Sequence, residues 1–581
     1  MRNKTFYKIG LGLQWMLLLG HLYYCRHGMP IPVVDATSRM LVQLMGSYEI
    51  HYIGGVHTLD ETIWGYDFTW ALYVLFIFAV SLLALRHQPR SRRLGRHLAL
   101  LNTLLWLGAL IVTLVYWSIP QQSLFALLTL TFFLSYWLEW KQPSPKDTRI
   151  CVVGAGISGL TAAYELQQQG YTQVTVLEKA DEVGGKCFTA EFFDQPFDLG
   201  GHEMLAGYND LVDIAEDLGA PTSTSIRPLV YDHDKKQYFN FKQAATISGK
   251  YSMTQVMLAS LKYLWLVVFP FRRISNPATG YSRMPAELAL PLEEWLVQRR
   301  LVALTDILSF VVKVQGYGRF TDTSAAYLVK FMGWRNWLSL LLSGIGLSTK
   351  WPRVLTLGAA NFCRRLAAGL QVRLRTNITR IVRSNEPGAA PVRIYLAGQS
   401  EPLVFDKLIL STPLELSGLH FLDVGAEEEV LFRQIRHFHF YTTVCEVQGL
   451  PAGVVASVPL NDIRRGQYTG YIKSYPTDPA AIFFSLAGHE VTGEKIEQEI
   501  VEVLAAVPDY DGQKPGVIRF LEQKGWHYFP HVSPQAVAEK YYDRLEALQG
   551  QRHTFYASSA LAFECMGNSV AYARRLMLKH F

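Results

Sequence analysis

The stretch RICVVGAGISGLTAAYELQQQGYTQVTVLEKADEVGG, residues 149–185, decides the fold of most of this 581-residue chain. Ile150–Val153 is a short β-branched run that predicts a buried parallel strand, and Gly154, Gly156 and Gly159 follow it at G-x-G-x-x-G spacing. Gly154 permits a tight turn, Gly156 lets a pyrophosphate approach the backbone, and Gly159 lets the next helix pack closely on the strand. The N-terminus of that helix offers unpaired N–H groups to phosphate.

A second strand and an acidic residue complete the unit. Val174–Leu177 predicts the strand, which ends at Glu178, where a carboxylate can accept hydrogen bonds from a ribose 2′-hydroxyl. A lone G-x-G-x-x-G is a weak signal, because glycine-rich turns are common, but strand, glycines, helix, second strand and acid occur here in order. We therefore predict a dinucleotide-binding α/β fold.

The residues that follow indicate which dinucleotide is bound, a flavin or a nicotinamide cofactor. Lys179 comes directly after the acid, Gly184, Gly185 and Lys186 follow, and the segment Asp198–Gly201 has the pattern D-x-G-G. This succession resembles the flavin-containing amine oxidase and phytoene desaturase superfamily. The resemblance implies non-covalent FAD, bound at its ADP end by the first glycines and the acid, and along its pyrophosphate and ribityl chain by the second glycine pair and its lysine.

Half of the residues are apolar and 13% are aromatic, as is usual for a soluble domain joined to membrane helices. Four mostly apolar runs of roughly 17 to 20 residues, the length that crosses a hydrocarbon core, precede residue 141. They are Tyr7–Cys25, Phe68–Leu85, Leu98–Trp117 and Leu124–Trp140. We predict an all-α, four-helix transmembrane domain over residues 1–142; burial of these runs inside a soluble bundle is the alternative.

Basic residues predict the orientation of these spans. The link between the second and third runs carries several arginines and no acidic residue. The loop 26–67 carries more acidic than basic residues. Short basic loops are typical of the cytoplasmic side. We therefore expect a multi-pass protein of the cytoplasmic membrane, with the flavin domain on the cytoplasmic side and the lipid bilayer as a partner. His51 and His57 in the outer loop fit no standard spacing, so no metal site is predicted.

The linker Lys141–Asp147 is too short for wide separation of the two parts. The six cysteines show no C-x-x-C, and we interpret them as free thiols. A covalent flavin link through Cys565 is an alternative, although its surroundings do not match the cysteine motif of the covalent amine oxidases. The net charge of +6 is explained by basic cytoplasmic loops, which are attracted to anionic lipid headgroups. Nucleic-acid binding is therefore not expected.

Helices are predicted between the second glycine pair and the return to the nucleotide fold. The ranges are 210–218, 290–299, 305–314 and 325–332, with a hairpin at 230–241. Val256–Phe271 is strongly apolar and is interrupted by Lys262. It is either a buried helix of the substrate domain or a surface that dips into lipid.

The chain then returns to the nucleotide fold. A helix at 361–368 and strands at 372–374, 378–383, 392–396, 403–405 and 408–413 are expected, and in the family the residue placed like Ile378 contacts adenine through its backbone. Strands at 441–448, 468–474 and 481–486 and a helix at 494–506 complete a substrate domain with a mixed sheet. We predict an FAD domain over 147–225, 361–425 and 530–581, and a substrate domain over 226–360 and 426–529.

The C-terminal segment contains WHYFPHVS at residues 526–533, followed by YYDRLEALQGQRHTFYASS and AYARRLM. It looks like the branch that contains bacterial polyenoic fatty acid isomerase and its relatives. The usual string there is Y-x-G-E, but Ser558 and Ser559 replace its glycine and acid, and Gly567 stands where relatives often carry glutamate. The helix N-terminus at Asn568–Val570 is expected to face the flavin pyrimidine and to stabilise negative charge there. The complete predicted FAD site is Gly154, Ala155, Gly156, Ile157, Ser158, Gly159, Glu178, Lys179, Gly184, Gly185, Lys186, Gly200, Gly201, His202, Ile378, Ser558, Ser559, Asn568, Ser569 and Val570.

No Ser-His-Asp set, metal cluster or paired acid appears at a telling spacing. His202, directly after the D-x-G-G turn, is the best catalytic candidate; the alternative is a hydrogen-bonding core histidine. Weaker candidates for the cavity are Tyr317, Tyr528 and His531, of which the two tyrosines are also catalytic candidates.

Three functions remain open from the sequence. The first is a membrane-anchored FAD oxidoreductase or redox-neutral isomerase that acts on a hydrophobic, lipid-like substrate by hydride transfer at flavin N5. The second is an amine oxidase that releases hydrogen peroxide, for which two facing aromatic residues in the cavity would be the feature to find. The third is a non-catalytic membrane scaffold or sensor. The sequence gives no oligomeric state.

Overall fold

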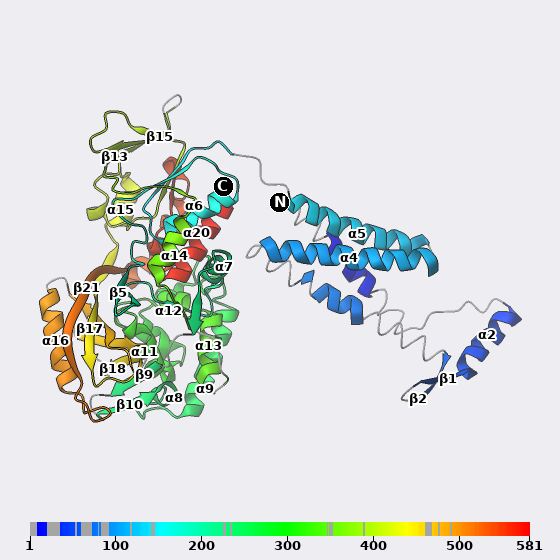
Figure 1. Cartoon of the computed structure of the whole chain (residues 1–581), viewed down its shortest axis with the longest axis horizontal. Coiled ribbons are helices and arrows are strands. Elements are labelled where there is room, and N and C mark those ends of the chain that lie inside the picture. The colour runs from blue at the N-terminus through cyan, green and yellow to red at the C-terminus, as the bar shows by residue number, and fades with distance from the viewer. Residues whose placement is uncertain are drawn as a thin grey trace. The chain divides into compact units, whose positions relative to one another are not determined.

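The protein was analysed as a computed structural model, and the chain forms two compact units, Met1–Ser144 and Pro145–Phe581. The structure describes residues 9–19, 35–52, 55–59, 72–79, 81–82, 92–116, 119–140, 146–224, 228–232, 235–344, 347, 352–386, 390–458, 467–474, 477–488 and 491–581. Figure 1 shows the second unit as a mixture of sheets and helices, and the first as helices with a small hairpin.

A five-stranded parallel sheet, in the order β12-β4-β3-β16-β22, forms the centre of the nucleotide fold. β3 (Ile150–Val153) and β4 (Val174–Leu177) have the predicted bounds, and both are fully buried, as a sheet covered on both faces requires. The other strands come from distant parts of the sequence: β12 (Gln371–Arg373), β16 (Lys407–Leu410) and β22 (Thr554–Tyr556).

Three helices from separate parts of the chain pack beside one another on this sheet (Figure 1). They are α6 (Ile157–Gln168), α14 (Ala359–Ala367) and α20 (Met566–His580). A three-stranded meander follows β12 and consists of β13 (Ile378–Arg383), β14 (Val392–Leu396) and β15 (Leu403–Phe405). Helix α15 (Ala426–Phe432) leads from there into the second large sheet.

The second sheet has seven strands in the order β10-β9-β18-β19-β20-β17-β21. Their bounds are β9 (Pro228–Asp232), β10 (Gln237–Asn240), β17 (Arg436–Gln448), β18 (Gly453–Val458), β19 (Gln467–Lys473), β20 (Ala480–Ala487) and β21 (Gly516–His531). Helix α16 (Gly493–Ala505) packs against β21 (Figure 1). β21 was not predicted as a strand, because its exposed face carries charged residues that hide the apolar alternation.

Most of the remaining helices come from the middle of the chain. They are α7 (Asn209–Asp217), α9 (Met253–Val268), α10 (Leu292–Gln298), α11 (Thr305–Val314), α12 (Ala325–Phe331) and α13 (Trp334–Gly344). Helix α11 packs on β19 of the second sheet, and α7 packs on α20. Short strands β5 (Thr189–Phe192), β6 (Gln195–Asp198), β7 (Glu203–Met204), β8 (Thr222–Thr224) and β11 (Arg353–Leu355) form two small sheets.

Helix α9, predicted at 256–271, has two apolar faces. One contributes Tyr263 and Leu266 to the core, whereas Leu258 and Trp265 on the other are 63% and 56% exposed. Lys262 on the exposed side donates to the carbonyl oxygen of Arg299. The buried-helix interpretation is therefore right for half of the helix, and the other half is an exposed apolar stripe.

The first unit consists of helical residues 9–19 and 72–79 with α4 (Arg92–Tyr116) and α5 (Ile119–Trp140), and of α2 (Ala36–Ser47) with a hairpin of β1 (Glu49–Tyr52) and β2 (Gly55–Thr58). Its helices bury an apolar cluster that includes Trp106 and Phe125. Asn102 lies inside and accepts hydrogen bonds from Gln14 and Ser81.

None of the helices over the described residues combines the length and the apolar character that crossing a membrane demands. The prediction of four transmembrane spans is therefore not confirmed. α4 and α5 lie where the third and fourth spans were predicted, but the first two are described only in part, since residues 1–8, 20–34, 60–71 and 83–91 lie outside the described residues.

Candidate functional site

The first glycine turn connects β3 to α6. Gly154 has φ +103°, a conformation that side chains disfavour, and Gly156 caps the N-terminus of α6. A Cβ at Gly159 would lie 2.0 Å from the carbonyl oxygen of Gly154. The helix therefore packs on the turn so closely that only glycine fits at this position.

The second glycine pair crosses the first. The N–H of Gly184 donates to the carbonyl oxygen of Ala155 at 2.9 Å. A Cβ at Gly185 would approach Cα of Gly156 to 3.3 Å. The two glycine segments thus form one surface of bare backbone at the N-terminus of α6, where a phosphate can approach N–H groups.

Glu178 closes this surface from the side of β4. Its carboxylate accepts one hydrogen bond from the N–H of Ala155 at 2.7 Å and another from Ala180 at 2.9 Å. It therefore holds the turn in place beside the position predicted for the ribose. Lys179 is exposed, and Ile378 begins β13 half-buried.

Two buried polar atoms at this end of the sheet suit a polar ligand. Among the described residues, Nδ2 of Asn568 and Oγ1 of Thr412 have no hydrogen-bond partner. Thr412 lies beside Gly154, and Asn568 lies in the first turn of α20. Burying unpaired polar groups is costly, so a flavin dinucleotide that spans both ends fits the residues present.

The serines that replace the family's glycine and acid behave differently. Oγ of Ser558 accepts a hydrogen bond from the N–H of Ala560 and caps a short helix, α19 (Ser559–Ala562). Neither Ser558 nor Ser559 lines the cavity described next. The structure therefore gives Ser558 a structural role.

A cavity of about 150 Å³ lies between the glycine surface and the second sheet. It brings together several predicted residues, Ile157, Lys186, Gly200, Gly201, His202, Tyr317, Tyr528 and Ser569. Its remaining walls are mainly apolar or aromatic and include Leu199, Phe331, Phe440, Phe484, Trp526 and Met566. Mostly apolar walls with a few convergent polar groups are typical of a small-molecule site.

His202 is the histidine of this cavity. Its Nδ1 lies 3.7 Å from a carboxylate oxygen of Asp198, which is itself buried and accepts from Thr189 and Ala359. Burial lowers the pKa of His202, but the Asp198 carboxylate outweighs it and raises the pKa above its usual value. His202 is therefore biased toward the protonated, positively charged form.

Tyr317 and Tyr528 face each other in this cavity, which is the feature to look for under the amine-oxidase hypothesis. Their rings are nearly parallel, at 16°, with centroids 5.7 Å apart. The hydroxyl of Tyr317 donates to the carbonyl oxygen of Glu564 at 2.9 Å. Burial raises the pKa of both phenols, so both stay protonated at neutral pH.

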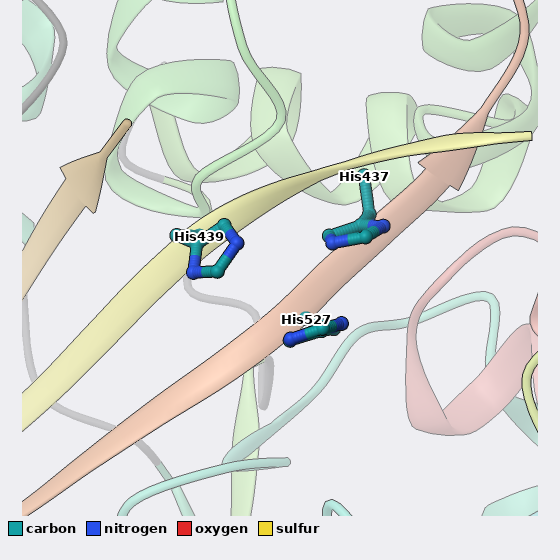
Figure 2. Close-up of side chains that lie close together, drawn as sticks. All are labelled: His437, His439 and His527. Carbon is teal, nitrogen blue, oxygen red and sulfur yellow. The ribbon is translucent and has the colours of Figure 1, made fainter. Parts of the chain in front are cut away.

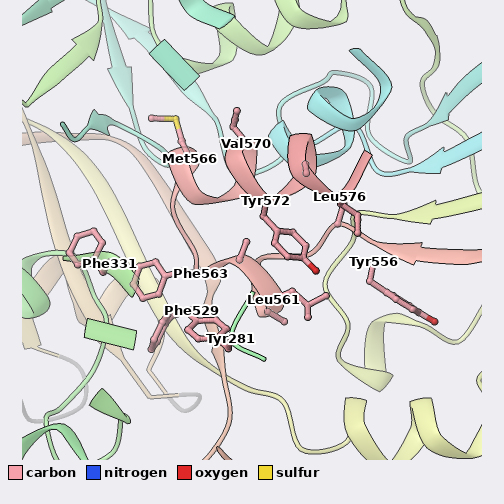
Figure 3. Close-up of a cluster of buried hydrophobic side chains, with 14 of the residues drawn as sticks. Tyr281, Phe331, Phe529, Tyr556, Leu561, Phe563, Met566, Val570, Tyr572 and Leu576 are labelled. Atoms are coloured by element: carbon pink, nitrogen blue, oxygen red, sulfur yellow. The ribbon is translucent and has the colours of Figure 1, made fainter. Parts of the chain in front are cut away.

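An aromatic cluster supports these two rings. Tyr317 packs on Phe331, Phe529 and Phe563, with centroids 4.7 to 5.1 Å away. Figure 3 shows these three phenylalanines side by side next to Met566 at the start of α20. Aromatic packing of this density fixes the ring positions and excludes water from that wall.

Sequence analysis missed Glu564 and Tyr208. Glu564 is buried, pairs with Lys186 at 2.6 Å and accepts from the N–H of Phe529. The ring of Tyr208 lies on Gly567, where an added Cβ would come within 1.9 Å of it. The only sequence signal for Glu564 was an acidic residue inside the apolar segment 561–566. The only signal for Tyr208 was indirect, namely that Gly567 stands where relatives often carry glutamate.

His531 is not part of this cavity. Its Nδ1 contacts the carbonyl oxygen of Phe529, its ring stacks on Phe438, and it lines a different cavity. The pairing of β17 with β21 is irregular between Tyr528 and His531, and the structure does not bring His531 to the cavity that Tyr528 lines.

Comparison with known proteins agrees with this arrangement. The family profile of flavin containing amine oxidoreductases matches residues 157–507, more than half of the chain. A polyenoic fatty acid isomerase of Ptilota filicina is 20% identical over 493 residues, which are 75% of this chain and 95% of that protein. The crystal structure of a CLA-producing fatty acid isomerase from P. acnes has a TM-score of 0.66 and 24% identity, and the match covers 75% of this chain and 99% of that one.

A putrescine oxidase solved with putrescine bound is also similar, with a TM-score of 0.55 and 15% identity over 75% of this chain and 99% of its own. Because both sequence identities are below 25%, the two solved structures support the fold and not the function. The family match, the crossed glycine segments and the cavity beside them lead to one conclusion: this chain belongs to the flavin-containing amine oxidoreductase family and is an enzyme of that FAD-dependent family.

Proposed function

We propose that this enzyme binds FAD non-covalently and transfers hydride between the flavin and a hydrophobic, lipid-like substrate, as an isomerase or an oxidoreductase. The observation that carries the proposal is the cavity between the glycine surface and the second sheet, whose walls are mainly aromatic and aliphatic. The likeness to a polyenoic fatty acid isomerase over 95% of its length supports the same class of substrate.

Flavin, when bound, supplies the capacity to take up and return a hydride at N5. The chain's own residues would hold the FAD and orient it. The crossed glycines and the N-terminus of α6 accept the pyrophosphate, and Asn568 offers an unpaired amide beside the N-terminus of α20. The Asp198 carboxylate favours the protonated form of His202 at the cavity wall, and in that form the imidazolium would stabilise negative charge nearby.

Non-covalent attachment is supported by the state of Cys565. Burial raises the pKa of its thiol to about 11, so it is protonated at neutral pH. Since the thiolate is the nucleophile, this cysteine is poorly suited to attack a flavin ring.

Amine oxidation is the second candidate, because Tyr317 and Tyr528 face each other inside the cavity. A group held between two parallel rings needs about 7 Å, twice the usual carbon–carbon contact. The measured 5.7 Å between centroids leaves no such slot. The geometry therefore favours the lipid-like substrate over an amine sandwiched between the rings.

Anaerobic spectroscopy separates these functions. The purified protein is expected to carry a yellow chromophore that heat releases as FAD, and a polyunsaturated fatty acid is expected to bleach it or to gain conjugated-diene absorbance. Benzylamine and putrescine serve as the amine arm, with peroxide measured on readmission of air. Response to amines alone would replace the proposal with amine oxidation, and absence of flavin would overturn both.

The exposed stripe of α9 supports contact of this unit with a lipid surface, from which an apolar substrate would come. Leu258, Leu261 and Trp265 lie on one side of the helix, and Phe269 follows at its end; each is more than half exposed. Lys262 lies within this stripe with its ammonium on the carbonyl oxygen of Arg299, so the apolar residues are the ones that would enter the interface.

Liposome co-sedimentation tests this contact on the full chain. Trp265→Ser combined with Leu258→Ser is expected to lower the fraction bound to vesicles of mixed phosphatidylcholine and phosphatidylglycerol. Ile518→Ser on β21, at a residue that is also 58% exposed, is the matched control and should bind like wild type. Equal binding by wild type and the α9 variant would exclude this surface.

A further inference from the structure

Three histidines meet on the β17–β21 ribbon. His437 and His439 are two residues apart on β17 and so share one face, and His527 on β21 is directly opposite His439 in the register. Figure 2 shows the three imidazole rings gathered together on these two strands.

Their spacing suits a single ion. One ligand nitrogen from each ring lies within 4.8 Å of the other two. The His437 and His527 rings are stacked at 15° with centroids 4.3 Å apart, so one ring has to turn for both nitrogens to point at one ion. Tetrahedral zinc with metal–nitrogen bonds of 2.0–2.1 Å places its nitrogens about 3.3 Å apart. The nitrogen–nitrogen separation therefore has to shrink by about 1.5 Å for zinc to bind. Rotation of the imidazole side chains can supply this change while the paired strands stay in place.

A carboxylate lies behind the cluster. Oε1 of Glu415 is 3.7 Å from Nδ1 of His437, and both side chains are about 15% exposed. Metal-binding histidines usually direct their second ring nitrogen at such a carboxylate, which fixes the ring orientation. Glu415 is thus placed to orient His437 while the other nitrogen faces an ion.

An ion can reach these rings from solvent. His527 is exposed, and His437 and His439 line a cavity of about 580 Å³ that also includes Arg319, Asp322 and His531. The flavin-side cavity lies on the opposite face of the same ribbon, where Phe440, Trp526 and Tyr528 form part of its wall.

We propose that His437, His439 and His527 bind one divalent transition-metal ion, with Zn²⁺ as the best match to three imidazoles and an open position. Imidazole nitrogens suit zinc, whereas calcium and magnesium prefer oxygen ligands. The ion joins two strands whose other faces carry residues of the flavin-side cavity, so it stabilises one wall of that cavity. The site does not depend on the substrate proposed above.

Equilibrium dialysis against Zn²⁺ tests the site. Chelator-treated full-length wild type is compared with His439→Gln/His527→Gln and with His420→Gln, an exposed histidine outside the cluster, as the matched control. Wild type and the control are expected to bind one more Zn²⁺ per chain than the double variant. Glu415→Gln should keep the stoichiometry and weaken binding about 10-fold, as loss of a carboxylate behind a ligand does.

Flavin content and circular dichroism establish that each variant is folded, and Co²⁺ gives an independent signal. Wild type loaded with Co²⁺ should show the visible absorption of a tetrahedral site, and the double variant should not. If the folded double variant binds Zn²⁺ with the same stoichiometry and affinity as wild type, the histidines are an ion-free stack and the proposal is overturned. Either result leaves the flavin chemistry to its own test.

Discussion

Individual residues of the glycine turn decide whether the cofactor can bind. A Cβ at Gly159 would lie 2.0 Å from the Gly154 oxygen and 2.4 Å from Oγ of Ser411. Gly159→Ala must therefore push α6 away from β3, and we expect the purified variant to lose most of its flavin, measured by absorbance. Gly516→Ala, at a position with no neighbour within 4 Å, should keep its flavin. Full flavin content in Gly159→Ala would contradict the close packing.

Lys330 is a fully buried lysine of α12. Its ammonium donates to the carbonyl oxygens of Asn276 and Thr279, and burial lowers its pKa to about 7. Between about pH 7 and 10 the unfolded chain therefore binds more protons than the folded one, so this lysine makes stability rise with pH.

Lys330→Met removes that titration. We expect the wild-type minus variant difference in unfolding free energy to grow by up to about 1.4 kcal/mol per pH unit across this window, measured by urea denaturation. Lys250→Met, at an exposed lysine, is the control and should show no such slope. A difference that is flat between pH 7 and 10 would show that Lys330 titrates normally in the folded protein.

The sequence predicted those site residues whose role depends on neighbours nearby in the chain. Gly154 and Gly159 are required by backbone conformation and by a contact five residues away, both of which a motif encodes. Glu564 and Tyr208 could not be predicted, because their partners Lys186 and Gly567 lie hundreds of residues away along the chain.

Among the elements, the N-terminus of α20 depends on the pairing of Gly567 with Tyr208. Gly567→Ala alone should destabilise the protein by about 1–3 kcal/mol, the usual cost of overpacking, and lower its flavin content. In a Tyr208→Ala background the ring is gone, so the same change should cost little. A double-mutant cycle by thermal unfolding checks this, and equal costs in both backgrounds would exclude the contact.

The elements differ in how well the sequence predicts them. β3, β4 and β13 to β15 match their predicted bounds, because short apolar runs between turn residues fix them locally. α13 and β21 were missed. β21 is held chiefly by pairing with β17 along its whole length, and a long-range pairing leaves little trace in the strand's own sequence.

For the whole molecule, the sequence predicted the nucleotide fold correctly and predicted a four-helix transmembrane domain over residues 1–142. Apolar length alone suggested four membrane spans, and the described helices do not confirm them. The family and the fold rest on the second unit, in which distant segments complete one parallel sheet.

Anaerobic mixing of the purified protein with a polyunsaturated fatty acid tests the central claim most directly. The account predicts a bound flavin spectrum that bleaches, or conjugated-diene absorbance that appears, with the fatty acid and with neither benzylamine nor putrescine. A colourless protein, or a flavin that is reduced by the amines and ignores the fatty acid, would contradict it.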